Sequence, residues 1–91
     1  LDDRSIQLVL RQVDSKDLAV ALKGVKSDVR SKILRNMSER ASQNLAEEID
    51  LLGPVRLKTV EDAQGAVVRI VRALEESGQI VLARSNDEFV E

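Results

Sequence analysis

The sequence predicts an all-α fold, a single compact domain of five to six short amphipathic helices. Apolar residues recur at helical spacing along most of the chain, and residues typical of helix ends separate these stretches. Every connection is only a few residues long, which is typical of packed neighbouring helices. With 43% hydrophobic and 33% charged residues and one aromatic residue, the 91-residue chain can form one core of aliphatic side chains. We expect residues 1–91 to be one domain, cut from a longer chain because it begins without Met.

The first two helices are predicted at about residues 2–12 and 15–24. An aspartate at position 2 or 3 can cap the first helix. Asp14 and Ser15 then interrupt the helical pattern and cap the second helix. Gly24 is typical of the residue that follows a helix end, and Lys23 lies just inside that end. The apolar residues of these two helices are Ile6, Val9, Leu10, Val13, Leu18, Val20, Ala21 and Leu22.

Two serines mark the starts of the third and fourth helices. Ser27 opens the third helix, and Ser38 caps a fourth helix from about Glu39 to Leu52, which Gly53-Pro54 stops. Apolar residues in the fourth helix are spaced by four, four and three, which predicts a single buried face. The apolar residues of these helices are Val29, Ile33, Leu34, Met37, Ala41, Leu45, Ile49 and Leu52.

The longest helix is predicted from Val60 to about Ser77. Thr59 with Asp62 resembles a capping box at its start, and Gly78 ends it. The tail, residues 79–91, has one apolar run and then turns polar, so a short strand, a sixth helix and a docked extension all remain open. The buried stripe of the long helix is expected to comprise Val60, Ala63, Val67, Ile70, Val71 and Leu74.

The composition argues against several classes of function. With 14 basic and 16 acidic residues the net charge is −2, so no broad positive field is available to hold nucleic acid. The absence of His and Cys removes the commonest general base and the usual transition-metal ligands. No apolar run approaches the roughly 20 residues that span a bilayer. We therefore expect no catalysis, metal, cofactor, nucleic-acid binding or direct membrane insertion.

The fourth helix carries a row of charges opposite its apolar residues. At about 100° per residue, Arg40 and Glu47 lie on nearly the same line, with Glu48 displaced toward the apolar edge. Adjacent carboxylates on a helix diverge, so this pair does not form a metal or acid/base site. Every amphipathic helix has a solvated face, Lys23 can simply complement a helix dipole, and Arg56 lies in a surface connection. These residues alone therefore do not establish a binding site.

Four short motifs give a more specific indication. They are Asp2-Asp3-Arg4-Ser5-Ile6-Gln7, Ala21-Leu22-Lys23-Gly24, Arg35-Asn36-Met37-Ser38 and Gly53-Pro54-Val55-Arg56. In this order and spacing they resemble the C-terminal domain of the FliG family of bacterial flagellar motor switch proteins. The resemblance runs over about residues 1–90 and covers only part of a FliG protein.

The resemblance implies a mechanical role. In that family the domain faces the inner membrane from the cytoplasmic side of the flagellar basal body and presents charges to the cytoplasmic loop of the stator protein MotA. Torque, rotation and its switching in motility and chemotaxis follow from this contact, with FliM and neighbouring FliG copies as further partners. Both acidic positions are commonly Asp in the family and are Glu here. The stator-facing residues carried over by motif are Lys23, Arg40, Glu47, Glu48 and Arg56.

Two alternatives remain open on the sequence. One is a small helical nucleic-acid module, which would use the basic residues on or beside the third helix. The other is a scaffold domain that binds a switch partner such as FliM through an apolar patch, without touching the stator. The basic residues of the first alternative are Lys26, Arg30, Lys32 and Arg35.

Overall fold

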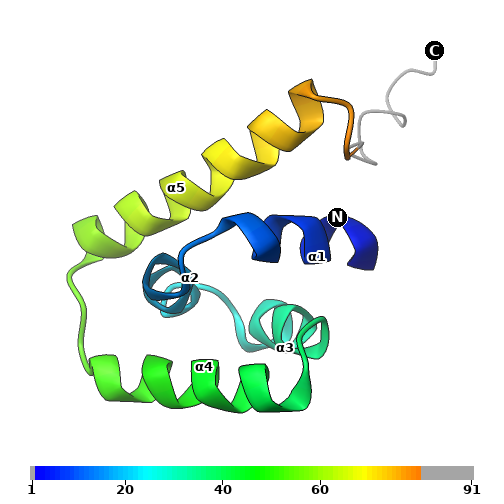
Figure 1. Ribbon diagram of the computed structural model, residues 1–91. Coiled ribbons are helices and arrows are strands. Elements are labelled where there is room, and N and C mark those ends of the chain that lie inside the picture. Colours follow the sequence, from blue (N-terminus) through cyan, green and yellow to red (C-terminus); the bar gives the residue numbers. More distant parts are fainter. Residues whose placement is uncertain (1, 81–91) are drawn as a thin grey trace.

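The computed structural model describes residues 2–80, and within them it contains five α-helices and no strand (Figure 1). The all-α class is therefore confirmed. The question of a strand, a sixth helix or a docked extension in the tail falls on residues 81–91, which lie outside the described residues. The helices are α1 (Asp3–Gln12), α2 (Ser15–Leu22), α3 (Ser27–Arg35), α4 (Glu39–Leu52) and α5 (Leu57–Glu76).

Helix α2 lies at the centre of the fold, between α4 and α5 (Figure 1). Every residue of its apolar run Leu18–Leu22 is buried. A helix that is covered on two sides has to be apolar around most of its circumference, which explains why this run contains no polar residue. Helix α2 therefore holds α4 and α5 in place on opposite sides of it. The two core clusters comprise Leu18, Ala19, Leu22, Leu45 and Ile49 toward α4, and Val20, Ala21, Val60 and Ala63 toward α5.

A third cluster joins α1 to the C-terminal half of α5. Val9 of α1 packs with Leu74 of α5 and with Ile80, which follows that helix. The chain turns back because Gly78 adopts a φ of 81°, a left-handed conformation that favours glycine. The backbone N–H of Gln79 donates to the Leu74 carbonyl at 2.9 Å, as in a Schellman motif. This turn brings Ile80 to 3% exposure beside Val9.

Three predicted helix caps are confirmed by hydrogen bonds. The Asp2 carboxylate accepts from the Ser5 backbone N–H at 2.8 Å, and Asp14 accepts from two N–H groups of α2 at 3.1 and 3.4 Å. The Ser38 hydroxyl accepts from the Ala41 N–H at 3.1 Å. Hydrogen bonds from the side chain and backbone of Ser5 hold the pKa of the Asp2 carboxyl below its usual range. These caps fix the starts of α1, α2 and α4.

The predicted start of the longest helix was wrong by about one turn. Helix α5 begins at Leu57 with Arg56 as its N-cap, so Thr59 lies inside the first turn and does not cap it. The carboxylate of Asp62 instead pairs with the Lys58 ammonium at 2.8 Å, one turn earlier on the same helix. An i,i+4 pair of this kind supports helix formation at the position where the sequence predicted a connection.

Helix α3 begins at Ser27, as predicted, but its apolar face is only partly covered. Ser27 is its first residue and the N-cap is Lys26, which makes no side-chain capping hydrogen bond. Val29, one of the apolar residues at helical spacing, is 44% exposed. No residue of α3 is fully buried, and Ile33 and Leu34 are only partly buried against the core. This helix lies at the edge of the fold, so its apolar face is incompletely covered (Figure 1).

Gly24 follows the C-cap of α2, as predicted, and the close approach of this turn to α5 is what favours glycine there. Among the described glycines only Gly53 and Gly78 have a positive φ. A Cβ added at Gly24 would lie 2.6 Å from Val60 Cγ1 and 2.9 Å from Gln64 Nε2. That Gln64 amide donates to the Ala21 carbonyl at 3.2 Å and so satisfies the C-terminal end of α2. The end of α2 therefore packs directly on α5.

We expect Gly24→Ala to lower the free energy of unfolding by about 1 to 3 kcal/mol, because the new methyl overpacks a buried contact with Val60. Gly65→Ala is the matched control. Its Cβ would meet only the Arg69 guanidinium at 3.6 Å, and alanine favours helix, so stability should rise by about 0.5 to 1 kcal/mol. Urea denaturation of both variants measures the difference. Equal changes of the same sign would contradict the close approach.

Candidate functional site

Helix α4 separates a buried face from a charged outer face. Leu45 and Ile49 are 4% and 2% exposed and point into the core. Arg40 and Glu47 are exposed, and Glu48 is half-buried at the edge between the two faces. At about 100° per residue, Arg40 and Glu47 lie within about 20° of each other around the helix axis. The structure thus has the predicted row on one rigid element.

The charges on this row have no partner among residues 2–80. The side chains of Arg40, Glu47 and Glu48 form no hydrogen bond or ion pair with another residue of the range 2–80. The Lys58–Asp62 pair on α5 shows that the surface does contain ion pairs elsewhere. Because these charges are not used to hold the fold together, they are available to a partner of opposite charge.

The other two predicted site residues lie at helix ends. Lys23 is half-buried as the C-cap of α2, and its backbone N–H donates to the Val20 carbonyl at 3.1 Å. Arg56 is exposed as the N-cap of α5. It follows Gly53, whose φ of 62° and ψ of −156° belong to a region that side chains disfavour. The structure thus brings three of the five predicted residues together on α4 and places the other two on separate connections.

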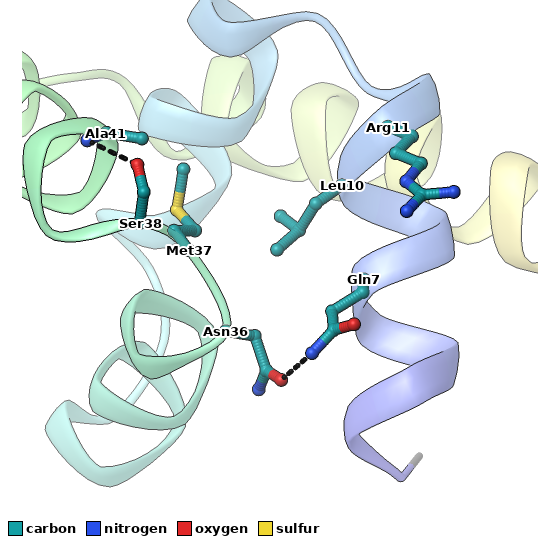
Figure 2. A pocket seen from close by; sticks show the side chains of 7 residues that line it. All are labelled: Gln7, Leu10, Arg11, Asn36, Met37, Ser38 and Ala41. Atoms are coloured by element: carbon teal, nitrogen blue, oxygen red, sulfur yellow. Dashed lines mark hydrogen bonds between the residues drawn. The ribbon is translucent and has the colours of Figure 1, made fainter.

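A hollow between α1 and the α3–α4 corner was not foreseen from the sequence. It is an open surface depression of about 300 Å³ beside the first turn of α4 (Figure 2). The Gln7 amide donates across it to Asn36 Oδ1 at 3.1 Å, and the Asn36 amide donates to Asp3 Oδ1 at 3.3 Å. Two of the sequence motifs, Asp2–Gln7 and Arg35–Ser38, meet in this region. The lining residues are Gln7, Leu10, Arg11, Asn36, Met37, Ser38 and Ala41.

The basic cluster of α3 is partly committed to the fold. The Arg30 guanidinium donates to the Leu22 carbonyl at 3.1 Å and is half-buried at the end of α2. Lys32 is also half-buried, and Asp28 adds a negative charge to the first turn of the same helix. This arrangement does not offer the continuous exposed basic surface that a phosphate backbone requires.

The described residues offer neither a metal site nor a membrane-spanning helix. In residues 2–80 no group of three or more Asp, Glu, His or Cys side chains is placed to hold a metal ion. None of the helices in this range combines the length and the hydropathy needed to cross a bilayer. The charged surface of α4, with Lys23 and Arg56 at its flanking connections, is therefore the candidate site that the geometry supports best.

A known protein family matches most of the chain. A family model described as the FliG C-terminal domain matches residues 1–82. The flagellar motor switch protein FliG of Thermotoga maritima is 57% identical over 88 residues, covering 97% of this chain and 26% of that protein. FliG of Borreliella burgdorferi is 51% identical over 90 residues, covering 99% and 26%. The chain thus spans about a quarter of the length of these relatives.

Solved structures show the same arrangement of helices. A crystal structure of FliG from H. pylori has a TM-score of 0.89 and 41% sequence identity, and the match covers 90% of this chain and 39% of that chain. The structure of full-length FliG from Aquifex aeolicus has a TM-score of 0.85 at 41% identity, covering 89% and 25%. The likeness therefore extends to both sequence and fold.

Proposed function

The chain belongs to the FliG C-terminal domain family, and from this we propose that it is the part of a flagellar rotor that meets the stator. In this proposal the outer face of α4 contacts the cytoplasmic loop of the stator protein MotA and receives the force that turns the rotor. The contact residues are Lys23, Arg40, Glu47, Glu48 and Arg56.

One observation carries the proposal. Arg40 and Glu47 are exposed on a single line of α4, opposite the buried Leu45 and Ile49, and neither charge has a partner among the described residues. A rigid helix that carries unused charges of both signs suits a partner that carries the opposite pattern.

The energetics of exposed charges suit a motor. Each exposed pair is worth only about 0 to 1 kcal/mol, so contacts form and release quickly and no single residue dominates. Reversal of rotation is then a change in how the domain presents this row to the stator. In this proposal the domain lies at the cytoplasmic face of the inner membrane, and its partners within the switch are FliM and neighbouring FliG copies.

The role we propose is mechanical and involves no catalysis. The nucleic-acid alternative has little support, because Arg30 is held at the end of α2 and the net charge is −2. The scaffold alternative, in which the domain binds FliM alone, differs in one measurable respect. It requires that charge reversal on α4 leave motor function intact.

The test is to place the five charge reversals together in the full-length switch protein of a motile bacterium and to measure swimming speed. We expect loss of swimming, with flagella still assembled and the protein present at its normal level, because the fold does not depend on these charges. Normal swimming of cells with all five reversals would reject the site and favour the scaffold alternative.

A further inference from the structure

The outer face of α4 ends in an exposed leucine. Leu51 is 85% exposed, whereas Leu52 beside it is partly buried and packs against two core clusters. The other exposed large hydrophobic residues of the range 2–80 are Val29, Leu57 and Val68, and none of them lies on α4. An exposed leucine is common on protein surfaces, so its position decides whether it matters.

Leu51 lies in the same line as the charges. At about 100° per residue, Arg40, Glu47 and Leu51 fall within about 40° around the axis of α4, on the side opposite Ile49. At about 1.5 Å per residue this line is about 17 Å long. It presents a positive charge near one end, a negative charge one turn before the other end, and an apolar side chain at that end. The pattern is continuous with the proposed stator surface.

We propose that Leu51 is the apolar contact of this surface and that its partner is an amphipathic segment of complementary pattern. That segment carries an apolar side chain about one helical turn from a basic residue. The basic residue meets Glu47 while the apolar side chain meets Leu51, and an acidic residue farther along meets Arg40. The inference rests on the proposed function, because it names the chemistry of the stator loop at the same site.

The physical reason is that the two kinds of contact respond differently to salt. Coulomb attraction between exposed charges is screened as ionic strength rises. The removal of apolar surface from water is not weakened in this way. An interface that uses Leu51 therefore keeps part of its binding affinity at high salt. The same apolar contact sets the position of the partner along α4.

The experiment measures binding of the purified MotA cytoplasmic loop to the full-length switch protein at about 0.05 M and about 0.5 M salt. Leu51→Gln keeps helix propensity and removes the apolar surface. We expect it to weaken binding about threefold to tenfold at both salt concentrations, the change that partial burial of one leucine produces. Leu51→Met should recover most of the loss. Arg40→Glu should weaken binding measurably at low salt and much less at high salt, because salt screens the charge contact.

Val68→Gln is the matched control, because Val68 is 47% exposed on α5 and lies away from the row. Its binding should equal that of the parent. If Leu51→Gln also binds like the parent while Arg40→Glu does not, the inference fails and the proposed function stands. An equal loss in Val68→Gln also overturns the inference. If neither the charge reversal nor Leu51→Gln changes binding, both the inference and the proposed function fail.

Discussion

Replacing Leu45 by alanine should lower the free energy of unfolding by about 2 to 5 kcal/mol. Leu45 is 4% exposed in the middle of α4 and packs with Leu18, Leu22 and Ile49 in the cluster that joins α4 to α2. The substitution removes buried methyl groups and leaves a cavity between α2 and α4, so the loss contains both a transfer and a packing contribution. A loss of this size is a large fraction of the stability of a domain of this length.

Urea denaturation compares Leu45→Ala with Leu51→Ala. In these two variants of α4 the replaced leucine differs in burial. Leu51→Ala makes the same chemical change on the same helix, at a side chain that is 85% exposed. Its free energy of unfolding should stay within about 0.5 kcal/mol of the parent. If the two variants lost equal stability, or if Leu45→Ala lost none, the orientation of α4 in the fold would be wrong.

The second large effect concerns function and not stability. Arg40→Glu and Glu47→Arg, each made alone in the full-length protein, should impair swimming while the free energy of unfolding changes by no more than about 0.5 kcal/mol. Both side chains lie opposite the buried face of α4 and hold no partner in the range 2–80. Reversal turns an attractive contact into a repulsive one without disturbing the core.

Arg72→Glu provides the control for these reversals. Arg72 is exposed on α5 and is outside the proposed surface. Its reversal changes the net charge of the domain in the same direction and by the same amount as Arg40→Glu, and by the same amount in the opposite direction to Glu47→Arg, and it should leave swimming unchanged. Swimming speed, protein level and denaturation are measured for all three variants. Loss of swimming together with a large loss of stability would show that the α4 charges support the fold.

The local sequence was sufficient to predict the helices and the charged row. Capping side chains such as those of Asp14 and Ser38 accept hydrogen bonds from backbone N–H groups no more than three residues away. The local sequence is therefore enough to recognise them. The orientation of Arg40 and Glu47 follows from the period of α4 and from Leu45, which fixes its buried side. These features need no knowledge of how helices pack.

The remaining features depend on contacts between distant segments. The role of Gly24 follows from Val60, which is 36 residues away in the sequence and would lie 2.6 Å from an added Cβ. The exposure of Val29 follows from the place of α3 at the edge of the fold. The error at Thr59 arose because Asp62 has a competing partner one turn earlier. No periodicity in the chain encodes these long-range or competing interactions.

Compensating charge reversal tests the proposed contact between α4 and the stator most directly. Cells that carry Glu47→Arg or Arg40→Glu in the switch protein are given MotA variants in which one loop charge at a time is reversed, and swimming speed is measured for each pair. We predict partial recovery for pairs that restore opposite signs and no recovery for pairs that leave like signs, because only the former regain a favourable interaction energy. Failure of every pair to recover, with both proteins folded and present at normal levels, would contradict contact between α4 and the stator.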